Sequence, residues 1–316
     1  MKTKHLVLLF ISPTLTLLLT LFSFSVYALD TANAKPALKR IVVLEFSLLD
    51  DLLQLGIKPV GIASSRADEG TNPPFLLPQI KDIEDVGTRQ QPNLEKIMAL
   101  HPDLIVADIT MQKKIYPLLK RIAPTLMLNG LSGNIDTQEQ NLRILAEATH
   151  TQDNVDTLIK NLRKRYAAAK KTGTEHPASV MIGYANNAGQ FQVLTANALT
   201  SRILKELGHP NLITIYREEQ SAPVPIETIL ANNPDSIIVL LTDGNMTPYH
   251  ALIRHPLWNE IRAVKTQHIY FMDRDLWAKN HGILATELML KEAEETGFLT
   301  NKPNTALLES SGTPGK

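Results

Sequence analysis

The chain has 316 residues, no cysteine, and 32 basic against 32 acidic side chains. The absence of cysteine excludes disulfides, thiolate catalysis, zinc–cysteine sites and iron–sulfur clusters. The balanced charge lacks the basic excess that binds nucleic acid or an anionic membrane surface, so no nucleic-acid partner is expected.

Residues 1–28 are predicted to be a cleaved signal peptide. Lys2 and Lys4 form a basic start, residues 6–24 are mostly apolar, and Val26-Tyr27-Ala28 is typical of a cleavage site apart from the bulk of Tyr27. A retained membrane anchor is the alternative, because about 18 apolar residues can span a bilayer. Cleavage would leave 288 residues (316 − 28). Without a cysteine to carry a lipid, such a protein is expected in the periplasm of a Gram-negative cell.

Apolar strands alternate with short helices in the next part of the chain. The run Arg40-Ile41-Val42-Val43-Leu44 is rich in β-branched residues and is typical of a buried parallel strand. A loop rich in proline, glycine and charge is expected at 64–78. Further strands are predicted at 60–63, 104–107 and 125–128, and helices at 48–55 and around 112–122.

A long helix is predicted at 151–172, after a helix at 136–149. Apolar residues recur in it at helical spacing, at Val155, Leu158, Ile159, Leu162 and Tyr166. About 22 helical residues span roughly 33 Å, which is enough to bridge two lobes. A single stiff connector of this kind is expected to permit small lobe movements rather than wide closure.

The remaining part repeats the alternation of strand and helix. Strands are predicted at 179–183 and 268–272, a hairpin arm at 191–195, and helices at 200–207, 249–263 and 282–296. Alternation in both halves indicates open, mostly parallel sheets. The predicted organisation is a signal peptide (1–28), an N-terminal lobe (37–150), a connecting helix (151–173), a C-terminal lobe (174–300) and a disordered tail (301–316).

One stretch of sequence occurs twice, at 92–106 and again at 225–239. In each copy a glutamate, Glu95 or Glu227, opens a short helix, a Pro-Asp pair follows, and an apolar strand comes next. The pattern could be ordinary punctuation between helix and strand. Because 52–57 is also echoed at 203–209, we instead infer two similar halves with a cleft between them, where ligands usually bind.

From Arg40 to about Glu295 the chain resembles the periplasmic substrate-binding proteins of ABC importers for ferric siderophores, ferric citrate, haem and vitamin B12. The resemblance implies an α/β fold with two Rossmann-like lobes of mostly parallel sheets joined by one long α-helix. It also implies a monomer without enzymatic activity or cofactor, whose partner is an inner-membrane ABC permease. The phrases that favour the ferric-citrate binders are 40–45 (RIVVLE), 86–95 (VGTRQQPNLE), 122–126 (IAPTL), 255–258 (HPLW) and 275–278 (DLWA).

The resemblance assigns roles to matching residues. Glu95 and Glu227 are expected at the outer tips of the lobes, where each would meet arginines of the permease; the alternative is that each only favours its helix start. Arg89 matches an arginine that contacts the iron chelate, although it could instead pair with an acid. Further ligand-binding candidates are Arg274, Trp277, Lys279, His281, Tyr184, Thr110, Gln112 and Arg66. Trp277 could also simply be a packing residue.

The expected ligand is an anionic ferric chelate, with Fe³⁺-citrate favoured. Ferric iron prefers oxygen donors, which citrate supplies itself, so the protein would need cations, hydroxyls and an aromatic wall rather than direct metal ligands. Segments 109–113 and 278–282 carry less arginine than the citrate binders, which leaves the chelate open. Haem, a corrinoid or another siderophore are alternatives, with His281 or Tyr184 as a haem ligand. An exported enzyme is more remote, because the common catalytic motifs are absent.

Overall fold

The computed structural model describes residues 40–65, 72–186, 190–213 and 220–304, all within one compact unit, Leu38–Lys316. The predicted signal peptide and Arg66 lie outside the described residues, and the lobe boundaries stay predictions. No helix in the described part of the chain is long and apolar enough to cross a membrane.

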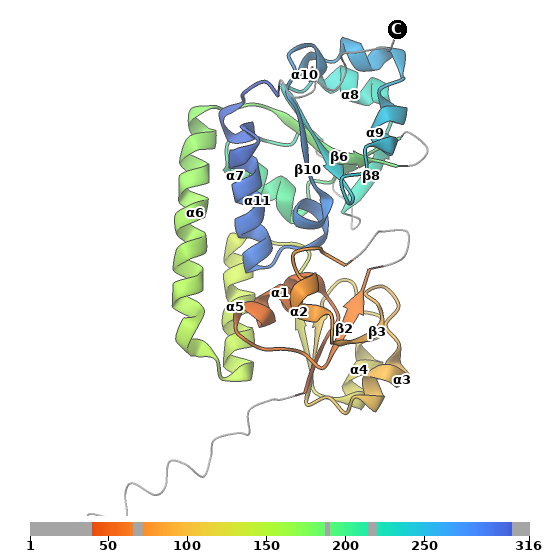
Figure 1. The fold of residues 1–316 in the computed structure, drawn as a ribbon, viewed down its shortest axis with the longest axis vertical. Coiled ribbons are helices and arrows are strands. Elements are labelled where there is room, and N and C mark those ends of the chain that lie inside the picture. Colours follow the sequence, from red (N-terminus) through yellow and green to blue (C-terminus); the bar gives the residue numbers. More distant parts are fainter. Residues whose placement is uncertain (1–39, 66–71, 187–189, 214–219, 305–316) are drawn as a thin grey trace, which may run out of the picture. The chain divides into compact units, whose positions relative to one another are not determined.

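The N-terminal lobe is built on a parallel five-stranded sheet with the order β3-β2-β1-β4-β5 (Figure 1). Its central strands β1 and β4 are buried along their whole length, which explains why residues 41–43 and 104–107 are continuously apolar rather than alternating. The strands are β1 (Ile41–Val43), β2 (Gly61–Ser64), β3 (Glu84–Thr88), β4 (Leu104–Asp108) and β5 (Thr125–Leu128). The helices are α1 (Phe46–Gln54), α2 (Leu77–Ile80), α3 (Leu94–Ala99), α4 (Tyr116–Ile122) and α5 (Ile135–Thr149).

The C-terminal lobe has a mixed sheet with the order β10-β9-β6-β7-β8. Strands β6, β9 and β10 are parallel, whereas β7 is antiparallel to both neighbours, as the predicted hairpin arm required. The strands are β6 (Val180–Ala185), β7 (Phe191–Leu194), β8 (Ser221–Val224), β9 (Ser236–Leu241) and β10 (Ile269–Asp273). The helices are α7 (Leu199–Glu206), α8 (Ile226–Asn232), α9 (Thr247–Leu252), α10 (Arg262–Lys265) and α11 (Ile283–Glu295). Two 3₁₀-helices, η3 (Pro256–Glu260) and η5 (Phe298–Thr300), and one π-helix, η4 (Asp275–Lys279), are also present.

The single helix predicted at 249–263 is wrong, because this stretch forms α9, η3 and α10 separately. Pro256 has no N–H to donate and disfavours helical backbone in the residue before it. His255 accordingly has extended backbone angles, φ −69° and ψ 128°. The predicted helix around 112–122 is also shorter, since α4 begins at Tyr116 and leaves residues 109–115 as a loop after β4.

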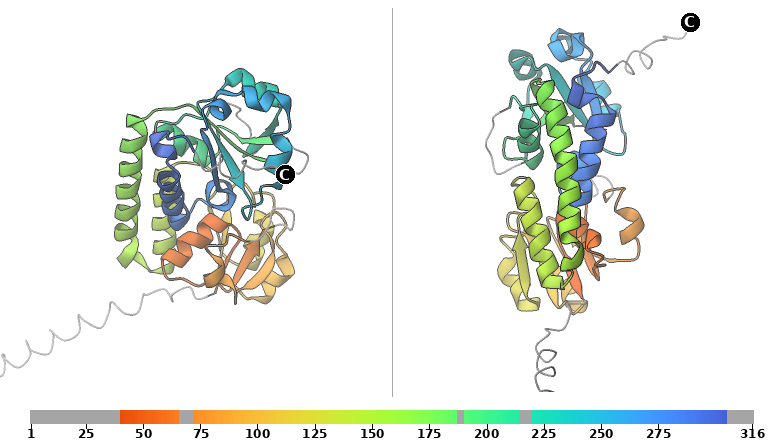
Figure 2. Two further views of the ribbon diagram at one scale, coloured as in Figure 1. Left: turned by 45° about the horizontal axis from the view of Figure 1, so that its top comes forward. Right: turned by 90° about the vertical axis from the view of Figure 1, so that its left-hand side faces the viewer.

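The long helix α6 (Val155–Glu175) follows a short turn, η2 (Gln152–Asn154), and contacts both α5 and α11 (Figures 1 and 2). Its buried residues recur at helical spacing. Gly173 is required near its end, because a Cβ there would lie 2.1 Å from the carbonyl oxygen of Leu207. One hydrophobic cluster runs from α1 through α6 to α11 and joins the two lobes, while two smaller clusters each lie within one lobe.

The beginning of the predicted disordered tail is ordered. The Asn304 side-chain amide donates to the Ile269 carbonyl (2.8 Å), and the Tyr270 hydroxyl donates to the Lys302 carbonyl (2.7 Å). These contacts fasten residues 301–304 to β10, so the prediction for these four residues is wrong. Residues 305–316 lie outside the described part.

Candidate functional site

The carboxyl ends of the parallel strands carry the candidate site residues, as expected for ligand binding in open α/β sheets. In the N-terminal lobe, Arg89 follows β3 and Thr110 follows β4. In the C-terminal lobe, Tyr184 lies near the end of β6 and Arg274 follows β10. The structure divides the candidates between a buried contact and two cavities.

Arg89 is buried in the contact between the lobes. Its Nη1 donates to Glu45 Oε1 (3.3 Å) and to the Lys279 carbonyl (3.4 Å), and its Cζ lies 4.2 Å from the centroid of the Phe46 ring. Only 4% of Arg89 is exposed. Burial raises the pKa of Glu45 to about 7, with the Arg89 guanidinium acting in the opposite direction. Arg89 therefore compensates a buried carboxylate in this arrangement, and it does not line either cavity described below.

Gln112, Lys279 and His281 belong to the same buried contact. Gln112 accepts from the Asp108 N–H (2.7 Å) and donates to the Arg89 carbonyl (2.7 Å). Lys279 pairs with Asp275 at 2.7 Å, and both are at most 5% exposed. Burial lowers the pKa of His281 to about 4, which favours the neutral imidazole. Each of these three side chains is enclosed by protein groups, so its contact with a ligand stays a prediction.

Trp277 packs in the hydrophobic core. It is 1% exposed, its Nε1 donates to Glu292 Oε2 (2.6 Å), and its ring meets Phe298 edge-on. These contacts agree with the packing alternative for Trp277, and its role as an aromatic wall of the cleft stays a prediction.

A strand-end cavity of about 430 Å³ opens at the carboxyl ends of β6, β9 and β10. The Arg274 guanidinium lies 3.8 Å from the centroid of the Tyr184 ring, and its Nη1 is 3.4 Å from Thr242 Oγ1. Arg274 Nε has no hydrogen-bond partner among the residues that the structure describes. The Tyr184 hydroxyl lies 3.1 Å from Ser221 Oγ. The Arg274 Nε is a buried atom, so the suitability of Arg274 for an anionic ligand rests on the charge of its guanidinium at the cavity wall.

A second cavity, the basic groove, has a volume of about 710 Å³ and is lined from both lobes. Thr110 and two lysines, Lys113 and Lys114, come from the loop after β4, and Arg202 comes from α7. Arg202 also donates to the Gly133 carbonyl (3.3 Å). The other lining residues are Ile109, Ser132, Asn197 and Gln220, so the lining contains three cations and no carboxylate.

Asp108 shapes the loop that carries the groove's lysines. Its Oδ1 accepts from the backbone N–H groups of Thr110 and Met111 (both 2.8 Å), and its Oδ2 accepts from Gly130 N–H (2.8 Å). Sequence reasoning missed Lys113, Lys114 and Arg202. The difference between segment 109–113 and the citrate binders pointed to the loop that carries the lysines. Nothing in the sequence pointed to Arg202, because it lies far along the chain on another element.

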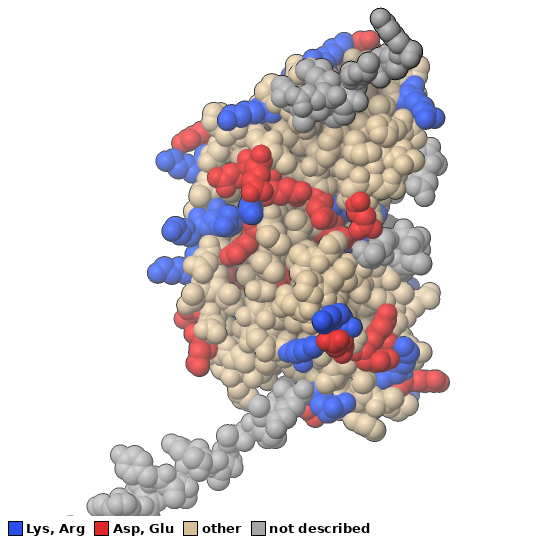
Figure 3. Space-filling view, viewed as in Figure 1, with Lys and Arg blue, Asp and Glu red and all other residues tan. Residues whose placement is uncertain are grey.

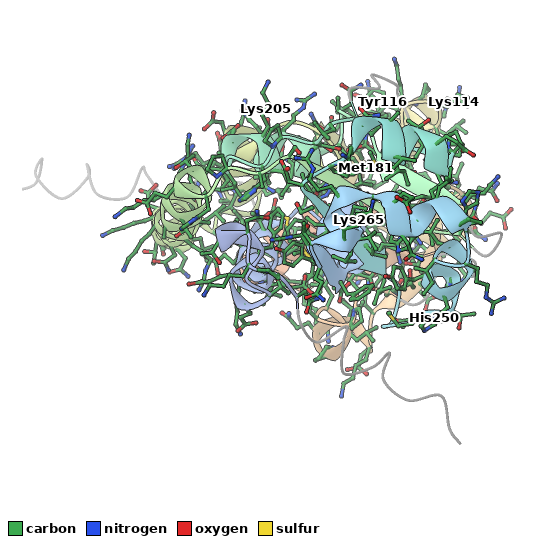
Figure 4. The ribbon with its side chains drawn as sticks, turned by 90° about the horizontal axis from the view of Figure 1, so that it is seen from above. Lys114, Tyr116, Met181, Lys205, His250 and Lys265 are labelled. Carbon is green, nitrogen blue, oxygen red and sulfur yellow. The ribbon has the colours of Figure 1, made fainter. Side chains whose placement is uncertain are left out.

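Lysine and arginine side chains lie at several separate places on the face drawn in Figure 3. Figure 3 shows acidic side chains gathered over α11 and the end of β10 on one face. Figure 4 shows Lys114 at the periphery, on a different part of the molecule from Lys205, while Met181 lies within the C-terminal lobe. Among the described residues, no group of three or more acidic or histidine side chains is placed to hold a metal ion.

The two repeated glutamates occupy equivalent places. Glu95 is in the first turn of α3, where the Asn93 side chain caps the Glu95 and Lys96 N–H groups (both 3.0 Å). Glu227 is in the first turn of α8, after Pro225. Both side chains are exposed, and α3 and α8 belong to different lobes (Figure 1). Each helix leads to a parallel strand, β4 or β9, so the sequence repeat is a repeat of one structural unit.

Residues 41–276 match the family described as periplasmic binding protein. The chain is 32% identical to the Fe(3+)-citrate-binding protein YfmC of Bacillus subtilis, over 80% of this chain and 79% of that protein. It is 29% identical to the Fe(3+) dicitrate-binding periplasmic protein FecB of Escherichia coli, over 79% and 81%. The fold matches that of Staphylococcus aureus SirA complexed with staphyloferrin B with a TM-score of 0.69 and 23% identity, covering 83% of this chain and 93% of SirA.

Proposed function

The chain belongs to the periplasmic binding protein family, and from this membership we propose that it captures ferric citrate or a related ferric carboxylate chelate and presents it to an inner-membrane ABC permease. The main support for an anionic chelate as the ligand is the basic groove, because its lining has three cations from two lobes and no carboxylate. The similarity to proteins named for ferric citrate supports the same class.

The proposed binding mode uses charge and hydrogen bonds rather than direct coordination of iron. Citrate oxygens hold the ferric ion, and the outer carboxylates accept hydrogen bonds from Lys113, Lys114 and Arg202. Charge-assisted bonds of this kind are about twice as strong as neutral ones. Because the donors come from both lobes, the bound chelate bridges them. Arg274 in the strand-end cavity supplies a further donor to a larger chelate.

A larger carboxylate siderophore is the second candidate, and the presence of two separate cavities favours it. Haem is less well supported, because His281 is enclosed and Tyr184 is stacked under Arg274. The protein is proposed to work as an exported monomer in the periplasm of a Gram-negative cell, after removal of residues 1–28. It is proposed to bind its ligand without turnover.

A titration of the purified protein with a panel of ligands tests this function. Ferric citrate is expected to bind saturably with a fixed stoichiometry, and the chelate should be recovered chemically unchanged. A neutral ferric hydroxamate should bind at least about tenfold more weakly, a difference of about 1.4 kcal/mol, because it offers no carboxylate to the groove. Affinity for ferric citrate should fall as salt is added. Preference for haem or cobalamin, or chemical change of the ligand, would contradict the proposal.

The docking role of the repeated glutamates is tested by the double variant Glu95→Ala/Glu227→Ala. Exposed ion pairs contribute about 0–1 kcal/mol each, so the two residues are expected to orient the protein on the permease rather than to provide most of the binding free energy. Iron uptake by cells should fall at least about tenfold while ferric citrate affinity is unchanged. Glu84→Ala/Glu260→Ala, which also removes two exposed acids, is the control. Normal uptake by the Glu95/Glu227 variant would refute the docking role.

A further inference from the structure

Helix α11 begins without a cap from its own residues. Its N-cap is Gly282, which has no side chain, and the first N–H groups of a helix have no partner within the helix. Two aspartates of α1 supply the acceptors. The Ile283 N–H donates to Asp51 Oδ1 (3.0 Å), and the Ala285 N–H donates to Asp50 Oδ2 (2.8 Å). Helix α11 is therefore capped by the other lobe.

Both aspartates are enclosed. Asp50 is 0% exposed and Asp51 is 2% exposed. Gly282 leaves the space that they occupy, because a Cβ on it would lie 2.5 Å from both Cβ and Oδ2 of Asp50. The backbone of Gly282 has an ordinary negative φ of −75°, so close approach, and not backbone conformation, requires glycine here. We name Asp50 and Asp51, together with the start of α11 at 282–285, the cross-lobe cap.

Other polar contacts surround the cross-lobe cap and also join the two lobes. Gln138 of α5 donates to the His281 carbonyl (2.6 Å) and to Thr286 Oγ1 (2.8 Å). The His281 N–H donates to Ser47 Oγ (2.8 Å). Each contact involves residues 274–286, the segment that directly follows β10 and begins with Arg274. The position of this segment against the N-terminal lobe is thus specified by directional bonds rather than by apolar packing alone.

Apolar contact would stabilise such an interface without the free energy needed to remove carboxylates from water. Burial raises the pKa of Asp50 to about 7, which reflects the free energy needed to keep its carboxylate away from water. Replacing buried charged groups by packed apolar ones is often neutral or stabilising, so stability alone does not explain two adjacent buried aspartates. Hydrogen bonds, however, restrict the distance and angle between the groups that they join more narrowly than apolar contact does.

We propose that Asp50 and Asp51 are positioning residues, which cap α11 across the lobes and thereby set the spacing between the two lobes that line the ligand site. Their effect on lobe spacing does not depend on what the ligand is. Only the consequence for binding rests on the proposed function. With the cap removed, the N–H groups at the start of α11 lose their acceptors, and the C-terminal lobe gains freedom relative to α1.

The absence of cysteine makes a distance measurement straightforward, because two introduced cysteines can be spin-labelled without other changes. Lys120→Cys on α4 and Lys265→Cys on α10 report the spacing between lobes, and Lys205→Cys with Lys265→Cys reports a distance within one lobe. The test variants are Asp50→Ala/Asp51→Ala and Gly282→Ala. The Gly282 variant retains both carboxylates but forces them away, so it still tests the proposal if the double variant does not fold.

In the ligand-free protein, both test variants are expected to widen the distribution of the cross-lobe distance by at least about twofold, without widening the distance within the lobe. Asp50→Asn/Asp51→Asn should remain close to the wild type, because asparagine also caps helices. Asp108→Ala is the matched control, since it removes a fully buried aspartate with three backbone partners inside one lobe. It should reduce stability without widening the cross-lobe distance.

An unchanged cross-lobe distribution in every test variant that folds would overturn the proposal, as would equal widening in Asp108→Ala. Ferric citrate affinity is the second readout, and it should fall at least about tenfold in the test variants. If the lobe distances change as expected but the wild type does not bind ferric citrate, the proposed function fails and the role of the cross-lobe cap stands.

Discussion

The triple variant Lys113→Gln/Lys114→Gln/Arg202→Gln is expected to bind ferric citrate at least about hundredfold more weakly than the wild type, a loss of about 2.8 kcal/mol. In the proposed binding mode each residue makes one charge-assisted contact to a carboxylate, and about 1 kcal/mol from each is sufficient. All three line the basic groove, and Arg202 and the lysines approach it from different lobes. Equilibrium dialysis with iron-labelled ferric citrate measures the change directly.

The matched control is Lys160→Gln/Lys170→Gln/Lys205→Gln, which removes the same charge at exposed positions on α6 and α7. Lys205 is particularly informative, because it lies on the same helix as Arg202 but outside the groove lining. The control should change affinity by less than about threefold at physiological salt, where charges more than about 8 Å apart are largely screened. Equal losses in both variants would show that net charge, and not the basic groove, attracts the chelate.

Arg89→Ala is expected to lower the free energy of unfolding by about 3 kcal/mol, because it leaves Glu45 buried without its cation. The two side chains are 5% and 0% exposed. The loss also removes the contact with the Lys279 carbonyl and the stacking on Phe46. Urea denaturation followed by circular dichroism measures the change, and the slope of the transition shows whether unfolding stays cooperative.

Two comparisons define the role of Arg89. Arg89→Ala/Glu45→Gln should recover part of the lost stability, because it removes the uncompensated charge. Arg143→Ala, which breaks an exposed pair with Asp156 (2.8 Å), should cost no more than about 1 kcal/mol. If Arg89→Ala instead weakens ferric citrate binding at least about tenfold with unchanged stability, Arg89 contacts the ligand, as the family resemblance implied.

The sheets and the repeat were predictable from local patterns. Continuous apolar runs such as 41–43 and 104–107 indicate strands covered on both faces, and the structure has them as β1 and β4. The long apolar stripe of α6 was equally clear. The ends of helices and the start of the C-terminal tail were predicted less well. Pro256 divides the stretch predicted as one helix, and residues 301–304 are ordered only because β10 offers them hydrogen-bond partners.

The strand ends that carry the candidate residues were predictable from the sequence, but which of their side chains are enclosed was not. Residues at the ends of β3, β4 and β10 were expected in the cleft, and they do lie at those strand ends. Whether such a residue faces solvent or is enclosed depends on which residues of the other lobe pack against it. The residues next to it in the sequence do not show this. Arg89 is enclosed because Glu45 and the segment after β10 meet there.

The sequence by itself determined the two α/β halves, the connecting helix and the paired glutamates, because hydrophobic period and helix-start chemistry are local properties of the chain. Only the tertiary structure decided which cations remain available to an anion. Burial and charge pairing depend on groups far apart in sequence. Asp51 meets Ile283 across 232 positions, and Arg202 joins Lys113 in one groove only because two lobes are packed together.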